Sequence, residues 1–172
     1  MVEFTTSSAK ETEKLGESLA HSLRSGSGSF TSILRSVEVE GGLSSQALII
    51  ALNGELGAGK TTFIKGFARG LGIKETVTSP TYVFVRSYSF EPVIRQSFHK
   101  DTLYHLDLYR LDYQDKKTLQ SFGFDEILSD PKGIVVIEWA EMVDWSSHPD
   151  VLALKLEYED KFTRRVTLEV SR

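Results

Sequence analysis

Hydrophobic residues along the chain predict a sheet with a buried centre. Two continuous apolar runs, Ala47–Leu52 and Gly133–Ile137, have the length of strands that are covered on both faces, as in a parallel sheet. Shorter or alternating runs predict four more strands, of which the last two are expected to form an antiparallel pair: Tyr82–Tyr88, Leu103–Tyr109, Val151–Tyr158 and Arg164–Val170.

Three other stretches have the spacing of helices. Apolar residues fall on one face of Thr12–Leu23, with Thr12 as the expected N-terminal cap, and on one face of Lys60–Leu71, which is followed by a glycine. A third helix is expected over Gln114–Phe122. Strands that alternate with helices and then give way to a β-rich end predict an α/β domain with a mixed, partly antiparallel central sheet.

Two segments interrupt this pattern. Ser25–Ser45 begins rich in serine and glycine, and Glu91–Asp101 is mostly polar and contains a proline, so both are expected to be flexible elaborations (25–45 and 91–101) on the fold. Neither segment is long enough to form a hydrophobic core of its own. Because separate cores arise only beyond roughly 250 residues, the 172 residues are expected to form a single domain, 1–172.

Composition narrows the class of protein. With 40% hydrophobic and 26% charged residues, the chain is expected to fold and not to sit in a membrane. The absence of cysteine excludes disulfides, thiol catalysis and cysteine-bound zinc. A net charge of −4 argues against a dedicated nucleic-acid binder. No signal peptide or membrane-spanning run is evident, so a cytoplasmic protein is expected.

A glycine-rich motif lies between the first buried run and the helix after it. Residues 54–61, Gly-Glu-Leu-Gly-Ala-Gly-Lys-Thr, fit the pattern G-x-x-x-x-G-K-[ST], in which backbone N–H groups surround phosphates, the lysine reaches the β- and γ-phosphates and the hydroxyl ligates Mg²⁺. A P-loop NTPase-like domain with three layers is therefore predicted. The residues expected to bind nucleotide are Gly54, Leu56, Gly57, Ala58, Gly59, Lys60, Thr61 and Thr62.

The sequence also indicates the base and the metal partners. A Ras-type guanine site needs an Asn-Lys-x-Asp box, and the one asparagine in the chain is Asn53, so ATP or ADP is favoured. Magnesium needs a carboxylate besides Thr61, and both Asp107 and Glu138 follow strand-like runs. Which of the two acids contacts the metal directly stays open.

Two neighbouring residues have alternative interpretations. His105 alternates with Asp107 along a strand, so it either orients the site or packs in the core. Arg110 either neutralises phosphate charge or pairs with a surface acid, and the second is slightly favoured.

Four blocks, in order, resemble the TsaE (YjeE) family of small P-loop ATPases, which support threonylcarbamoyladenosine formation in tRNA. The blocks are residues 52–62, Ser-Pro-Thr-Tyr at 79–82, His-Leu-Asp-Leu-Tyr-Arg at 105–110 and Glu-Trp-Ala-Glu at 138–141, and an opening helix near Thr12 is also similar. Glu55 departs from the aspartate that is commoner in the family, and the two longer segments put inherited details of partner docking in doubt.

The resemblance implies a function and residue roles. It implies a Mg²⁺-dependent ATPase of low intrinsic activity that assists TsaD- and TsaB-like partners, with tRNA contacted only through that complex. Lys60, Asp107, Glu138 and Trp139 would be catalytic, and Thr61, Asp107 and Glu138 would hold the metal. Ser79–Thr81 would act as a switch-like segment.

Two other functions remain open from the sequence. One is a small-molecule phosphotransferase, which usually needs a lid with several arginines. The other is a nucleotide-dependent binding module without turnover.

Overall fold

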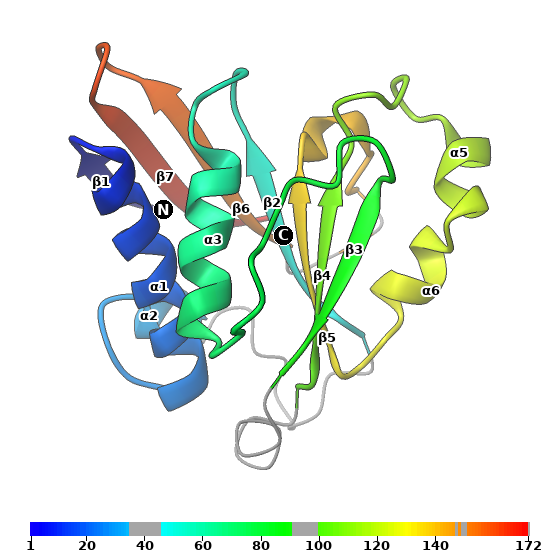
Figure 1. Ribbon diagram of the computed structural model, residues 1–172, viewed down its shortest axis with the longest axis horizontal. Coiled ribbons are helices and arrows are strands. Elements are labelled where there is room, and N and C mark those ends of the chain that lie inside the picture. Colours follow the sequence, from blue (N-terminus) through cyan, green and yellow to red (C-terminus); the bar gives the residue numbers. More distant parts are fainter. Residues whose placement is uncertain (35–45, 91–99, 147, 149–150, 172) are drawn as a thin grey trace.

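A single seven-stranded sheet with helices on both faces forms the protein (Figure 1). The computed structural model describes residues 1–34, 46–90, 100–146, 148 and 151–171. In chain order the elements are β1 (Val2–Thr6), α1 (Ala9–Ser25), α2 (Thr31–Leu34), β2 (Leu48–Asn53), α3 (Lys60–Gly70), β3 (Val85–Ser89), β4 (Thr102–Asp107), α5 (Lys116–Ser121), α6 (Phe124–Leu128), β5 (Gly133–Glu138), the 3-10 helix η1 (Ala140–Met142), β6 (Val151–Tyr158) and β7 (Arg164–Ser171).

The sheet is parallel at its centre and antiparallel toward its edges. Its strand order is β1-β7-β6-β2-β5-β4-β3. Strand β2 pairs in parallel with β5 and β6, and β4 pairs in parallel with β5. Antiparallel pairing joins β7 to β6, β1 to β7 and β3 to β4. The predicted α/β class and mixed sheet are confirmed.

Alternating side chains of the central strands divide the core into two halves. Ile50 and Leu52 of β2 belong to the cluster that α1 and α3 cover, whereas Ile49 and Ala51 point into the cluster under α5 and α6. Because successive strand residues face opposite sides, strands that are apolar throughout fill both clusters. The residue parity of each strand therefore decides which face of the sheet a side chain reaches.

Glycines bring α1 and α3 into close contact. A Cβ added to Gly66 of α3 would lie 1.8 Å from the Glu13 carbonyl oxygen, and one added to Gly16 of α1 would lie 2.2 Å from the Phe63 carbonyl oxygen. Arg69 of α3 also forms an ion pair with Glu13, at 2.7 Å. The helix that follows the P-loop is consequently packed backbone to backbone against α1.

The start of α1 differs from the prediction. The helix begins at Ala9, and Ser8 is its N-cap, with its hydroxyl accepting a hydrogen bond from the Glu11 N–H at 3.2 Å. Thr12, expected as the cap, lies inside the helix, where its buried hydroxyl is 2.8 Å from that of Thr6. The spacing of apolar residues identifies the buried face of the helix, but it carries no information about the first turn, which is polar.

Part of the first predicted elaboration is packed against the core. Gly26, with φ of 63°, ends α1, and the Phe30 side chain is buried with its ring 4.9 Å from that of Phe4. Residues 35–45, the remainder of that elaboration, and 91–99 of the second lie outside the described residues.

The strand predicted over Tyr82–Tyr88 begins later than expected. Strand β3 starts at Val85, because residues 81–83 form a turn and Phe84 has φ of 62°. None of the described helices has both the length and the apolarity to cross a membrane.

Candidate nucleotide site

The glycine-rich loop connects the end of β2 to the start of α3. Gly54 has φ of 140°, and a Cβ there would lie 2.3 Å from the Leu156 carbonyl oxygen, so this position requires glycine. Gly59, with φ of 107°, is the N-cap of α3, and no described side chain caps that helix end. The N–H groups of the first turn are thus directed at the loop, where the helix dipole favours an anion.

Lys60 is buried and held by the loop. Its ammonium donates to the carbonyl oxygens of Gly54 at 2.6 Å and Glu55 at 3.0 Å. Burial lowers the pKa of Lys60, and the nearby carboxylates of Glu138, Glu141 and Asp107 partly oppose this shift. A desolvated ammonium at the mouth of a phosphate loop is suited to contact phosphate oxygens strongly.

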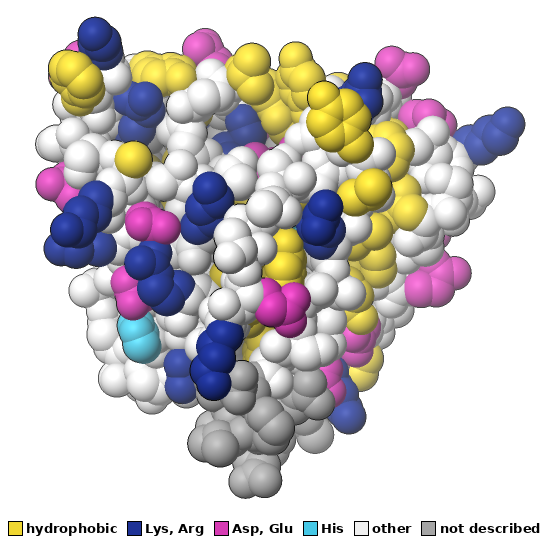
Figure 2. All heavy atoms as spheres, in the orientation of Figure 1, with side chains coloured by type: hydrophobic (Ala, Val, Ile, Leu, Met, Phe, Trp, Pro, Cys, Tyr) yellow, Lys and Arg dark blue, Asp and Glu magenta, His cyan; other side chains and the backbone are white. Residues whose placement is uncertain are grey.

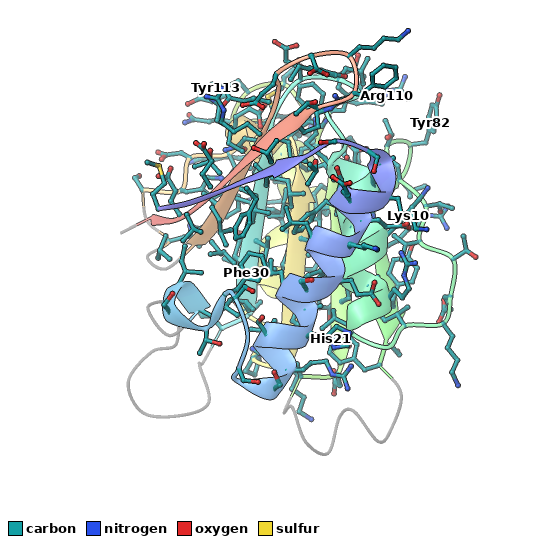
Figure 3. The ribbon with its side chains drawn as sticks, turned by 90° about the vertical axis from the view of Figure 1, so that its left-hand side faces the viewer. Lys10, His21, Phe30, Tyr82, Arg110 and Tyr113 are labelled. Carbon is teal, nitrogen blue, oxygen red and sulfur yellow. The ribbon has the colours of Figure 1, made fainter. Side chains whose placement is uncertain are left out.

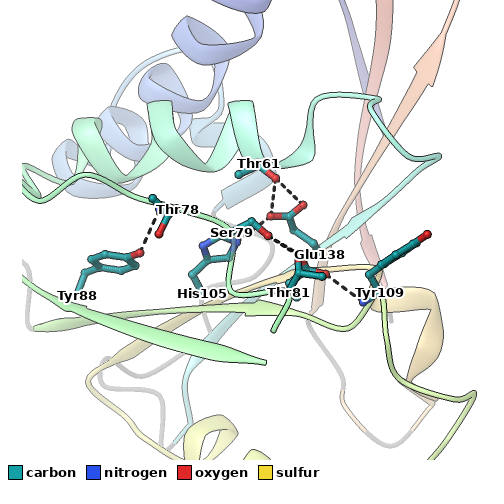
Figure 4. Close-up of polar contacts among 9 residues, drawn as sticks. Thr61, Thr78, Ser79, Thr81, Tyr88, His105, Tyr109 and Glu138 are labelled. Atoms are coloured by element: carbon teal, nitrogen blue, oxygen red, sulfur yellow. Dashed lines mark hydrogen bonds and ion pairs between the residues drawn. The ribbon is translucent and has the colours of Figure 1, made fainter. Parts of the chain in front are cut away.

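Glu138 is the carboxylate closest to the P-loop threonine. The Thr61 hydroxyl lies 2.9 Å from both Glu138 carboxylate oxygens and donates to them (Figure 4). Strand β5 neighbours β2 directly, so its last residue, Glu138, reaches the start of α3. Glu138 as a residue is 3% exposed, and its Oε1 is also 2.9 Å from Nε2 of buried His105.

Asp107 lies one strand further away and binds a different segment. It is paired in register with Glu138 at the ends of β4 and β5. One of its oxygens accepts from the Ser79 hydroxyl at 2.7 Å and from the Thr81 hydroxyl, and the other accepts from the Tyr109 N–H at 3.0 Å. Asp107 therefore anchors the Ser79–Thr81 segment.

Trp139 closes one side of the site. It follows β5 with φ of 60°, a left-handed conformation that turns the chain sharply after Glu138. Its ring centre is 3.9 Å from the Lys60 ammonium and 5.0 Å from the Tyr109 ring centre. Indole and ammonium are thus within the range of a cation–π contact.

These groups surround a cleft of about 310 Å³. That volume is at the lower end of the roughly 300–1,000 Å³ of small-molecule sites. Its lining consists of Leu56, Gly57, Gly59, Lys60, Thr61, Thr62, Ser79, Thr81, Asp107, Tyr109, Glu138 and Trp139. Two predicted residues are not part of that lining, namely Gly54, whose backbone abuts Leu156, and Ala58, which is completely buried.

Some residues of the site carry little or no sequence signal. The Tyr158 hydroxyl of β6 donates to the Leu56 carbonyl oxygen at 3.1 Å across 102 positions of sequence. Tyr109 is in a recognisable motif, but its contact with Trp139 depends on the folded chain. Arg110, for which a surface acid was slightly favoured, instead has its guanidinium 4.9 Å from the Tyr82 ring centre (Figure 3).

The donor set fits a magnesium-bound nucleotide. Among the described residues no group of three or more histidine, cysteine or acidic side chains gathers to cage a metal. Two carboxylates and a threonine hydroxyl at a phosphate loop are the oxygen donors that suit Mg²⁺, which usually takes its remaining ligands from substrate phosphates and water. The uncapped helix end and buried lysine supply the matching anion site.

A parallel strand, a glycine-rich loop and a helix, with carboxylates at the ends of neighbouring strands, define a P-loop protein of the α/β class. A family model described as "Threonylcarbamoyl adenosine biosynthesis protein TsaE" matches residues 6–166. The chain belongs to the TsaE family, as the resemblance of its motifs predicted.

Relatives and a solved structure agree with this assignment. The tRNA threonylcarbamoyladenosine biosynthesis protein TsaE of Bacillus subtilis is 34% identical over 69% of this chain and 67% of its own length. The protein of that name in Nostoc is 36% identical over 70% and 68%. The crystal structure of Bacillus subtilis YdiB, 24% identical, covers 99% of this chain and 86% of its own, with a TM-score of 0.66, and shares the fold.

Proposed function

We propose that the protein binds and hydrolyses ATP with Mg²⁺ and thereby assists threonylcarbamoyl transfer to the adenosine beside the tRNA anticodon. TsaD- and TsaB-like proteins in the cytoplasm are the proposed partners. The observation that carries the proposal is the contact of the P-loop Thr61 with Glu138, 2.9 Å apart, beside buried Lys60. Family membership supplies the tRNA-modification context.

The polar residues of the cleft have proposed tasks. Lys60 and the N–H groups at the start of α3 bind the phosphates, and Thr61 and Glu138 hold the metal, with Asp107 completing its environment. The metal, when bound, offsets the charge of the phosphate oxygens. Glu138 also orients the attacking water, and Ser79–Thr81 on Asp107 forms the part that senses the phosphate end of the nucleotide.

Slow turnover by the isolated protein follows from the charges in the cleft. Lys60 is the one cationic side chain among the described residues that line it. P-loop enzymes gain on the order of 10³–10⁵ in rate from an arginine supplied in cis or by a partner. We therefore propose that a partner completes the site. The same scarcity of arginine disfavours the phosphotransferase alternative, which needs cations around the transferred group.

The rim of the cleft suits contact with protein more than with tRNA. Tyr82, Tyr113 and Leu56 are 84%, 67% and 69% exposed. Hydrophobic side chains gather along the edge at which the parallel strands end. Tyr82 and Arg110 lie near each other there, and Tyr113 is at the same end of the molecule (Figures 2 and 3). The protein has a net charge of −4 and so attracts the phosphate backbone of tRNA weakly. We therefore assign tRNA contact to the partners.

The proposal is tested by ATP turnover with and without the two partners. We expect slow phosphate release by the protein alone, a rise of at least tenfold with both partners, and loss of turnover but not of ATP binding in Glu138→Gln. Equal turnover in both conditions would contradict the partner role. A phosphorylated small acceptor in place of free phosphate would show a kinase. ATP binding that is unchanged in Glu138→Gln, without phosphate release by either protein, would show a binding module.

A further inference from the structure

A buried histidine next to the cleft has no part in the contacts assigned so far to nucleotide and metal. His105 is in the middle of β4 with an exposed fraction of 0%, and it does not line the cleft. Its Nε2 is 2.9 Å from Oε1 of Glu138, which is the oxygen that also accepts from the Thr61 hydroxyl at 2.9 Å (Figure 4). The imidazole thus contacts the Glu138 carboxylate from the buried side, away from the cleft.

Strand geometry explains this contact. His105 and Asp107 are two residues apart on β4, so both side chains are on the face of the sheet that α3 covers. His105 is paired in register with Val136 and Asp107 with Glu138, which places the imidazole diagonally opposite the Glu138 carboxylate. Strand pairing, and not a mobile loop, therefore fixes the two partners relative to each other.

The acceptor fixes the proton on the ring. A carboxylate accepts hydrogen bonds, so Nε2 carries the hydrogen and donates it to Glu138. Nδ1 is then left as a buried nitrogen that has no hydrogen-bond partner among the described residues. Leu103 and Val136 on this face are both completely buried, so the surroundings of His105 are apolar. An apolar side chain at position 105 would pack there without leaving a nitrogen unpaired. Packing alone does not explain a histidine here, but the bond to Glu138 does.

We propose that His105 is a positioning residue for Glu138. Its Nε2–H binds Oε1 and keeps the carboxylate turned toward Thr61, so that Glu138 cannot rotate away from the phosphate loop. This inference rests on the proposed ATPase function, in which Glu138 orients water and metal. Groups that orient such a carboxylate typically change activity by about 10–100-fold when they are removed.

Two substitutions separate positioning from packing. Glutamine places its amide nitrogen about where Nε2 lies and keeps a donor, whereas leucine fills the space and removes the donor. Tyr104→Phe is the matched control, because it removes a hydrogen bond of the same length, 2.9 Å to Asp130, from the adjacent residue of the same strand. Tyr104 does not line the cleft.

We expect His105→Leu to lower kcat for ATP at least tenfold while KM and ADP affinity stay within about twofold, and His105→Gln to recover most of the rate. In the Glu138→Gln background, His105→Leu should add no further loss, since both changes remove the same function. Full activity in His105→Leu, a Gln variant as impaired as Leu, or additive losses in the double variant would overturn the proposal.

A second measurement needs no activity. In the nucleotide-free protein with ¹⁵N-labelled histidine, one of the four imidazoles should show an Nε2–H that exchanges slowly with water, and His105→Gln should remove that signal. Absence of this signal, or a proton on Nδ1 of His105 in place of Nε2, would overturn the positioning role even if ATP hydrolysis is robust. A slowly exchanging Nε2–H without any ATP turnover would support the contact and contradict the proposed function instead.

Discussion

Lys60 is the residue on which phosphate binding should depend most. Its ammonium donates to the Gly54 and Glu55 carbonyl oxygens, and we expect phosphate oxygens to replace these acceptors. The exchange is favourable because a charged hydrogen bond between ions is stronger than one to a neutral carbonyl.

We therefore expect Lys60→Ala to weaken ADP binding by at least about tenfold, or about 1.4 kcal/mol. Isothermal titration with ADP measures this, and Lys65→Ala, an exposed lysine one turn further along α3, should leave the affinity unchanged. Equal affinity of Lys60→Ala and wild type would refute the P-loop assignment.

Tyr104, near the end of β4 that is away from the cleft, gives a prediction for how stability depends on pH. Burial, reinforced by Asp130, raises the pKa of the Tyr104 phenol to about 12 from 10.0. Between these values the unfolded chain releases the phenol proton and the folded protein retains it, so this contribution to stability is complete below pH 10 and is lost as the pH rises toward 12.

Urea unfolding at about pH 9 and pH 11 should thus show a larger decline for wild type than for Tyr104→Phe. Parallel declines of the two proteins would mean that the phenol titrates normally.

At the scale of single residues, the motif predicts the site residues that are adjacent in sequence. It does not predict those that come together only when the chain folds. The proposed roles of Lys60 and Thr61 follow from their spacing. Which of Asp107 and Glu138 is next to Thr61 depends on which strand neighbours β2, and spacing carries no information about that. The Tyr158 contact with Leu56 is likewise a property of the sheet order.

At the scale of elements, the packing of α1 on α3 makes a prediction with an unusual sign. Glycine to alanine in a helix interior normally stabilises by about 1 kcal/mol. At Gly66 the new Cβ would lie 1.8 Å from the Glu13 carbonyl oxygen, so the two helices must separate.

We expect Gly66→Ala to destabilise the protein by about 1–3 kcal/mol, as overpacking does. Thermal or urea unfolding measures the loss, and Lys65→Ala in the same helix should be nearly neutral. A Gly66→Ala variant at least as stable as wild type would show that α1 can move away without cost.

The start of α1 is a second test at this scale. Because the Ser8 hydroxyl accepts from the Glu11 N–H, Ser8→Ala should cost about 1 kcal/mol of stability. Ser8→Asp keeps an acceptor and should be close to wild type in the same unfolding measurement. If Ser8→Ala is neutral, the cap contributes nothing in solution.

Elements with a continuous apolar run or a long amphipathic stripe were the predictable ones. The buried runs that became β2 and β5 and the amphipathic stripe of α3 are confirmed. Strand β1 and the short helix α6 were not predicted, since each has five residues and gains its stability from the neighbours that it packs against.

The whole molecule should respond to nucleotide, because the cleft joins the P-loop to the ends of β4 and β5 and to Ser79–Thr81. A ligand that binds only the folded state stabilises it by about 2.7 kcal/mol at a concentration 100 times its dissociation constant. We expect ADP with Mg²⁺ to raise the melting temperature of wild type and not that of Lys60→Ala. A shift of equal size in both proteins would place nucleotide elsewhere.

The class of fold was predictable at this scale, whereas the order of the strands was not. Alternation of strands with helices indicates an α/β sheet. The pairing of β1 with β7, which joins Val2 to Leu168, depends on contacts between distant parts of the chain that no local pattern records.

The register of β4 against β5 has a consequence for insertions and deletions. Loss or gain of one residue within β4 would turn each later side chain of that strand to the other surface of the sheet. Asp107 would then be directed toward the α5 and α6 side, and a leucine, Leu106 or Leu108, would be placed opposite Glu138. We therefore expect insertions and deletions to be tolerated better in the loops than in the strands. A one-residue insertion or deletion in β4 is expected to abolish activity even where the protein still folds.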